Sequence, residues 1–212
     1  MKTTILWDHD GVLVETEPLF YEATRLKFAE LGITLDKDDY IRDMARGISA
    51  WERVIAAGVT RDEVRMHKEH RNALYQGFLQ HRAIEIDGVE TVLEELSANY
   101  TMAIVTTARR ADFDLIHRDR NIRKHMSFVL ANGDYERKKP HHDPYLAALE
   151  RFGASKDETV VVEDSERGLR AAVAAGIDCV VVENDFVKGQ DFSTATHRIE
   201  SLSALPDLLR QM

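Results

Sequence analysis

The chain has 212 residues, of which 44% are hydrophobic and 31% are charged, and its formal net charge is −9 at pH 7. This composition is typical of a globular protein with a core of its own, and the negative charge disfavours nucleic acid or an anionic membrane as the main partner. Cys179 is the only cysteine, so no intramolecular disulfide is possible. No signal-peptide pattern and no apolar run near 18 residues is present, which predicts a cytoplasmic protein without a membrane span.

The first predicted strand, 5–7, runs directly into Asp8, Asp10 and Gly11. Residues two apart in an extended chain point the same way, so the two carboxylates could share one pocket. Carboxylates that close repel each other unless a metal ion or a proton offsets their charge. The pattern is also found in calcium loops and in turns with solvated acids, so the rest of the chain must decide between these interpretations.

Residues 18–81 contain no convincing strand. Ser49 with Glu52, and Thr60 with Glu63, have the spacing of a helix-capping box. Together with the apolar spacing, these signals predict four helices, over 18–31, 38–45, 49–57 and 60–80.

After Asp87 and Gly88 helices and strands alternate. We expect helices over 89–99, 111–119, 144–152, 166–175 and 202–211, and strands over 101–106, 127–130, 158–163 and 179–183. Continuously apolar strands such as 160–162 indicate a parallel sheet with both faces covered by helices.

The predicted fold class is therefore α/β: a doubly wound, Rossmann-like parallel sheet with an inserted all-helical cap. The first strand must join the sheet, so the helical block is an insertion, with the core over 1–14 and 86–212 and the cap over 15–85. In such a fold the ligand site lies beyond the carboxyl ends of the strands.

Polar residues collect at these strand ends. Thr106 and Thr107 end one strand, Glu163 and Asp164 end another, and Lys139 lies between them in the sequence. Convergent carboxylates, a hydroxyl and an ammonium suit Mg²⁺ together with a phosphoryl group, because the cation takes hard oxygen ligands while the other groups cover the phosphoryl oxygens.

Four short motifs in this order resemble the haloacid dehalogenase superfamily of phosphohydrolases and phosphotransferases, in the helical-cap branch that includes phosphoglycolate phosphatases and β-phosphoglucomutases. The resemblance spans nearly the whole chain. The motifs are Asp8-His9-Asp10-Gly11-Val12-Leu13, Ile104-Val105-Thr106-Thr107, Lys139-Pro140 followed by Asp143-Pro144-Tyr145, and Val162-Glu163-Asp164-Ser165 followed by Gly168 and Ala174-Ala175-Gly176.

The resemblance implies a catalytic role for Asp8, Asp10, Thr106 and Lys139. Asp8 would be the nucleophile that forms an aspartyl-phosphate, and Asp10 would exchange protons with the leaving oxygen and with water. Thr106, Thr107 and Lys139 would bind the phosphoryl oxygens.

The resemblance also implies a Mg²⁺ site. Its ligands would be the Asp8 carboxylate, the Asp10 main-chain carbonyl and the Asp164 carboxylate, while Glu163 would act through a bound water or hold its neighbours in place. The expected partner is a small phosphorylated metabolite, bound by a monomer or weak homodimer.

The cap loop is expected to select the substrate. The resemblance points to Arg46, Gly47, Ser49 and Trp51 as the residues that touch the leaving group. The sugar-phosphate mutases of this branch carry an arginine where this chain has Ala50, and a histidine where it has Phe20. Arg46 or Arg53 are possible substitutes for that arginine.

The function expected is a Mg²⁺-dependent phosphomonoester hydrolase. A β-phosphoglucomutase-like hexose-phosphate mutase is the alternative, and a non-catalytic protein of the same fold is a third. Asp10 argues against carbon–halogen chemistry, because the dehalogenases that name the superfamily lack the second aspartate.

Overall fold

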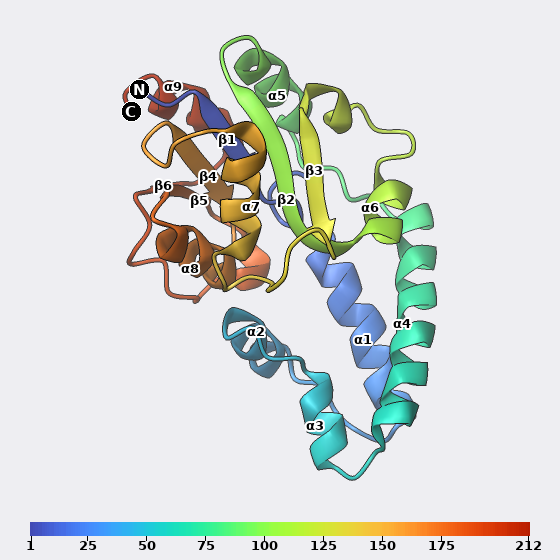
Figure 1. The fold of residues 1–212 in the computed structure, drawn as a ribbon. Coiled ribbons are helices and arrows are strands. Elements are labelled where there is room, and N and C mark those ends of the chain that lie inside the picture. The colour runs from blue at the N-terminus through green and yellow to red at the C-terminus, as the bar shows by residue number, and fades with distance from the viewer.

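The computed structural model describes all 212 residues, and six parallel strands form one sheet in the order β3-β2-β1-β4-β5-β6 (Figure 1). β1 lies in the middle, paired with β2 on one side and with β4 on the other. The chain winds outward from β1 in both directions, which confirms the predicted doubly wound fold. The strands are β1 (Thr4–Trp7), β2 (Thr101–Arg109), β3 (Phe128–Asn132), β4 (Thr159–Glu163), β5 (Asp178–Val182) and β6 (His197–Ile199).

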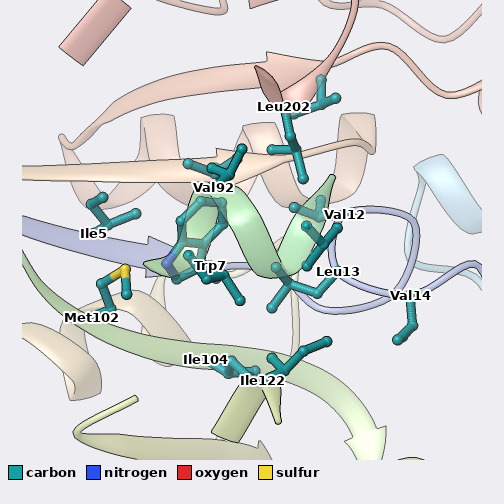
Figure 2. Close-up of a cluster of buried hydrophobic side chains, with 14 of the residues drawn as sticks. Ile5, Trp7, Val12, Leu13, Val14, Val92, Met102, Ile104, Ile122 and Leu202 are labelled. Atoms are coloured by element: carbon teal, nitrogen blue, oxygen red, sulfur yellow. The ribbon is translucent and has the colours of Figure 1, made fainter. Parts of the chain in front are cut away.

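Successive side chains of β1 enter two different cores, because neighbouring residues of a strand point to opposite faces of the sheet. Ile5 and Trp7 pack with Val92 and other residues of one cluster, part of which is drawn in Figure 2. Leu6 packs in the second cluster. The first face is covered by α5 (Val89–Ser97), α6 (Arg110–Ile116) and α9 (Leu205–Leu209), the second by α7 (Asp143–Phe152) and α8 (Glu166–Ala175).

A block of four helices between β1 and α5 forms the cap, at the end of the molecule toward which the arrowheads of β2 and β3 point (Figure 1). The cap has its own apolar cluster, which includes Phe28, Tyr40 and Trp51. Its two connections to the core meet at an isolated bridge between Val14 and Glu85. The helices are α1 (Glu17–Glu30), α2 (Lys37–Ala45), α3 (Trp51–Ala56) and α4 (Arg61–His81).

The cap contacts the core in several places, including α4 against α6, and two further contacts involve Gly47 and Phe186. Gly47 has a φ of +71°, and a Cβ built on it would lie 2.7 Å from Cδ of Pro140 in the core. Phe186, in the short helical turn Asp185–Val187 after β5, packs in the cap cluster with its ring centroid 6.4 Å from that of Tyr40.

Several expected elements differ from the structure. Ser49 does not cap α3, whose N-cap is Ala50 without a side-chain hydrogen bond, whereas the capping box of Thr60 and Glu63 is confirmed. The predicted helix over 202–211 is a 3-10 turn followed by α9, which ends at Leu209. β2 runs on to Arg109, and β6 was not predicted.

Two general features complete the fold. Cys179 lies in β5 and is 1% exposed, as its apolar surroundings in the sequence suggest. None of the helices has both the length and the apolar character needed to span a membrane.

Candidate active site

Asp8 lies where β1 ends, with its carboxylate against the ammonium of Lys139. The backbone N–H of Asp8 donates to the carbonyl of Val162 at 2.8 Å, which fixes Asp8 at the carboxyl edge of the sheet. Nζ of Lys139 donates to Oδ1 of Asp8 at 2.5 Å and to the carbonyl of Val105 at 2.8 Å. The buried Lys139 ammonium thus joins the end of β1 to Val105 of the neighbouring strand β2.

Glu163 surrounds the same ammonium from the end of β4. Its Oε1 accepts hydrogen bonds from Nζ of Lys139 at 2.7 Å and from the phenol of Tyr145 at 2.8 Å. Its Oε2 accepts a hydrogen bond from the hydroxyl of Ser165 at 3.0 Å. With both oxygens occupied and no exposed surface, Glu163 is placed to hold its neighbours, which is one of the two roles implied by the sequence.

Asp164 has a different environment from Glu163. It is 4% exposed, and its carboxylate accepts no hydrogen bond and contacts no cationic side chain. Oxygens of Asp8, Glu163 and Asp164 all lie within 4.8 Å of one another. A buried carboxylate without a partner is costly, and three hard oxygen donors in one place suit Mg²⁺. The residues present therefore fit the expected metal.

The charges of this cluster influence one another strongly. Burial and the nearby Glu163 carboxylate raise the pKa of Asp8 to about 7, although Lys139 opposes this. Burial and Glu163 likewise raise the pKa of Asp164 well above its ordinary value. Burial alone would lower the pKa of Lys139, but Asp8 and Glu163 raise it above its ordinary value. A bound cation reverses this effect on the carboxylates, because it favours their charged forms.

Asp10 is held by hydroxyl groups and lies near a histidine. Thr16 donates a short hydrogen bond to its Oδ1, and Thr106 donates to its Oδ2 at 3.2 Å. Nδ1 of His9 lies 3.3 Å from the same Oδ2, and its Nε2 lies 2.8 Å from Nε2 of His117. Burial alone would raise the pKa of Asp10, but His9 and the Thr16 hydroxyl hold it below its ordinary value.

A cavity of about 490 Å³ lies between the cap and the carboxyl edge of the sheet. Asp10, Thr107 and Lys139 line it from the core. From the expected cap loop it is lined by Gly47, Ser49 and Trp51, but not by Arg46, which is exposed. This volume suits a small metabolite, since ligand sites generally measure about 300–1,000 Å³.

Thr106 and Arg53 lie outside this cavity. Thr106 is fully buried, and its hydroxyl bonds to Asp10 in place of facing the cavity. Arg53 forms ion pairs with Asp43 at 2.7 Å and with Asp39 at 2.9 Å, within the cap.

The sequence did not single out several residues that complete the site. Glu17, Tyr40, Arg71 and Arg167 all line the cavity, and the phenol of Tyr40 donates to Oε1 of Glu17 at 2.5 Å. Arg167 occupies the first turn of α8, between the predicted metal ligand Asp164 and Gly168. This place in the sequence could have predicted that its side chain lies in the site. Arg71 gave no such signal, because it lies on a polar helix that is typical of a solvated face.

The chain resembles known proteins in its sequence and in its fold. The family model described as haloacid dehalogenase-like hydrolase matches residues 5–182. Protein CbbY of Rhodobacter capsulatus is 29% identical and covers 94% of this chain and 93% of its own length. A phosphorylated carbohydrates phosphatase of Thermotoga maritima is also 29% identical, over 82% of each chain.

A solved structure shows the same architecture. The crystal structure of CbbY from Rhodobacter sphaeroides in complex with phosphate has a TM-score of 0.81 and 25% identity, and the match covers 97% of this chain and 96% of that chain. The chain belongs to the haloacid dehalogenase-like hydrolase family. The phosphatase class predicted from the sequence agrees with these relatives.

Proposed function

We propose that this hydrolase is a Mg²⁺-dependent phosphomonoesterase that cleaves a small phosphorylated metabolite through an aspartyl-phosphate on Asp8. The observation that carries the proposal is the position of the Asp8 carboxylate between the Lys139 ammonium and the unpartnered carboxylate of Asp164. The relatives support it, because one acts on phosphorylated carbohydrates and the structure of another contains phosphate.

In the first step a carboxylate oxygen of Asp8 attacks phosphorus. An O–P bond forms to Asp8 while the P–O bond to the leaving group breaks, and the carboxyl group of Asp10 donates its proton to the departing oxygen. Lys139 and Thr107 bind the phosphoryl oxygens. Thr106 joins them when its hydroxyl turns away from Asp10.

In the second step Asp10 takes a proton from water, and the water oxygen attacks phosphorus. The bond between phosphorus and Asp8 breaks, which regenerates the carboxylate and releases inorganic phosphate. The hydroxyl group of Thr16 fixes the Asp10 carboxylate, and its hydrogen bond favours the ionised form that acts as base.

The Asp8 and Asp164 carboxylates and the main-chain carbonyl of Asp10 would hold Mg²⁺, which would supply positive charge that lets a carboxylate approach an anionic phosphoryl group. Because Gly11 has no side chain, there is room for the Asp164 carboxylate: a Cβ at residue 11 would lie 1.9 Å from Oδ2 of Asp164. The close packing of these two residues supports a site that is preformed for the cation.

The cap loop faces the leaving group. Gly47, Ser49 and Trp51 line the cavity opposite Asp10 and Lys139, and we assign substrate selection to them. A mutase is less well supported, because Ala50 and Phe20 line the cavity where the mutases of this branch carry an arginine and a histidine.

The test is release of phosphate from p-nitrophenyl phosphate and from a panel of sugar phosphates and phosphorylated acids, with Mg²⁺ and after thorough chelation. We expect hydrolysis that requires Mg²⁺ and that disappears in Asp8→Asn. Hydrolysis that survives chelation, or its absence with every phosphoester, would overturn the proposal.

A further inference from the structure

His9 is a buried histidine that the proposed mechanism does not use. It stands between Asp8 and Asp10 in the sequence, but it does not line the cavity. Its ring packs against α6, with its centroid 5.0 Å from that of Phe113 and 5.0 Å from that of His117. His9 is 0% exposed and His117 is 4% exposed. Ring nitrogens buried in this way are costly unless they have partners.

The contact between the two histidines decides where their hydrogen atoms lie. Nε2 of His9 lies 2.8 Å from Nε2 of His117, so one of these nitrogens donates and the other accepts. If a neutral His9 donated, its Nδ1 would turn a lone pair toward Oδ2 of Asp10 at 3.3 Å, and the Nδ1–H of His117 would have no acceptor. Both results are unfavourable.

The opposite arrangement avoids both penalties. When His117 donates, its own Nδ1 carries no hydrogen atom, and Nδ1 of His9 carries one that lies beside Asp10. A doubly protonated His9 would carry the same hydrogen atom. His9 therefore presents an N–H group to Asp10 in either state of charge.

This N–H group is a donor without an acceptor. Nδ1 of His9 has no hydrogen-bond partner, although Oδ2 of Asp10 is 3.3 Å away. That oxygen accepts a hydrogen bond from the hydroxyl of Thr106 at 3.2 Å, and Oδ1 accepts one from Thr16. A buried donor without a partner is unfavourable, so we expect it to bond to Oδ2 once that oxygen loses Thr106.

The proposed reaction removes Thr106 from Asp10. Thr106 binds a phosphoryl oxygen only when its hydroxyl turns away from Oδ2 of Asp10. The Asp10 carboxyl group would then be held at Oδ1 alone, by Thr16, and would be free to rotate just when it has to face the leaving oxygen. The N–H of His9 lies close enough to take the place of the Thr106 hydroxyl.

We propose that His9, with its hydrogen atoms fixed by His117, is a positioning residue that donates to Oδ2 of Asp10 when Thr106 turns to the phosphoryl group. This exchange of donors keeps the Asp10 carboxyl group aimed at the leaving oxygen while the P–O bond breaks. The proton that the leaving oxygen receives is that of Asp10, and His9 keeps its own. The inference rests on the proposed phosphatase function and adds a residue to its acid–base step.

Asparagine and glutamine at residue 9 separate the two nitrogens of the ring. The amide nitrogen of asparagine is bonded to Cγ, as Nδ1 of histidine is, so His9→Asn keeps a donor toward Asp10. The amide of glutamine lies one carbon further out, so His9→Gln keeps a partner for His117 instead. A residue needed only to fill the core would be replaced better by glutamine, which keeps more of the volume. The proposed role favours asparagine.

Phenyl phosphate and p-nitrophenyl phosphate measure how well Asp10 works as an acid. They share a ring, but the more basic phenolate depends more on protonation as it leaves. We expect His9→Gln to lower kcat/KM about tenfold more for phenyl phosphate than for p-nitrophenyl phosphate, which is part of the effect of a general acid. His9→Asn should restore most of that difference.

Phe113→Leu is the control, because it loosens the packing around both histidine rings without changing a hydrogen-bonding group. It should lower stability in urea unfolding and leave the ratio of the two kcat/KM values unchanged. A wild-type ratio in His9→Gln, or a larger change of the ratio in His9→Asn than in His9→Gln, overturns the inference.

Nitrogen-15 NMR tests the geometry without turnover, and it does not depend on the folding of the His9 variants. Signals assigned to His9 through its backbone show which ring nitrogen carries hydrogen. We expect a hydrogen atom on Nδ1, and we expect its proton resonance to move downfield in Thr106→Val, where no hydroxyl competes for Oδ2 of Asp10. A bare Nδ1, or a resonance unchanged in Thr106→Val, overturns the inference.

The same measurement separates this inference from the proposed function. The expected resonance together with no hydrolysis of any phosphoester would reject the phosphatase and keep the contact between His9 and Asp10. Hydrolysis together with an unchanged resonance in Thr106→Val would keep the phosphatase and reject the role of His9.

Discussion

Gly168 and Glu163 lie so close that a Cβ on Gly168 would stand 1.7 Å from Oε1 of Glu163. The same oxygen accepts the hydrogen bonds of Lys139 and Tyr145. The first turn of α8 therefore leaves space for the carboxylate that orients the Lys139 ammonium. A methyl group added at residue 168 would displace Glu163, and Glu163 would in turn displace Lys139. We expect the change to reach catalysis in this way.

Gly168→Ala should displace Glu163 or shift α8, and should lower both stability and turnover. Overpacking of this kind costs about 1–3 kcal/mol in the free energy of unfolding. Urea unfolding and the rate of phosphate release measure the two effects. Gly77→Ala is the control: nothing lies within 4 Å of its Cβ position, so this change within α4 should stabilise by roughly 0.5–1 kcal/mol. An active and equally stable Gly168→Ala enzyme would contradict the packing argument.

Asp8→Asn should abolish hydrolysis while the protein stays folded. Loss of a covalent nucleophile lowers kcat by roughly 10⁴-fold or more. Steady-state assays with p-nitrophenyl phosphate give the rate, and circular dichroism checks the fold. Retention of more than about a tenth of the wild-type kcat, far outside that range, would reject Asp8 as the nucleophile.

Asp164→Ala should raise the Mg²⁺ concentration needed for half-maximal activity, as well as lowering the rate. The remaining ligands make a weak site for an ion that prefers six oxygen ligands in octahedral geometry. Titration of activity with Mg²⁺ measures the shift, and Mn²⁺ binding followed by electron paramagnetic resonance gives a readout without turnover. An unchanged metal dependence in both measurements would show that Asp164 is not a ligand.

His117 should make the protein less stable in mild acid. Burial and the neighbouring His9 lower its pKa from the ordinary 6.5 to about 3. Between these values the unfolded chain binds a proton that the folded protein does not, so stability is complete above pH 6.5 and falls as the pH drops toward 3.

His117→Gln tests this pH dependence. The glutamine amide can donate or accept a hydrogen bond with His9 but does not titrate, so stability should fall less steeply below pH 6.5, by up to about 1.4 kcal/mol per pH unit. Urea unfolding over that pH range measures the slope, and exposed His141→Gln is the control. Equal slopes in wild type and His117→Gln would contradict the prediction.

The sequence predicted the sheet, the inserted cap and the chemical character of the site, because each depends on a local pattern. An apolar strand that is covered on both faces, such as 160–162, can be recognised from its own sequence, without knowing which residues pack against it. The carboxyl ends of parallel strands bring Asp8, Lys139 and Asp164 together once the sheet is known. β6 escaped prediction because its three residues include His197 and Arg198, which do not form an apolar run.

Residues that act across the gap between cap and core could not be predicted in this way. The polar side of α4 is indistinguishable in sequence from a solvated face, so nothing marked Arg71 as buried. Arg46 was expected near the leaving group from its place in the cap loop, but its side chain is exposed and outside the cavity. The direction of a loop side chain depends on tertiary contacts such as that of Gly47 with Pro140, which a sequence pattern does not contain.

The burial of Cys179 has a practical consequence. Burial raises the pKa of its thiol well above the ordinary value, so the native protein offers no thiolate for alkylation at neutral pH. Cysteines introduced for exposed Met66 on α4 and Val173 on α8 would therefore be the only sites to take a maleimide dye. One dye would report from the cap and the other from the core. Single-molecule energy transfer between them would show whether the distance between cap and core changes during turnover, without first replacing Cys179.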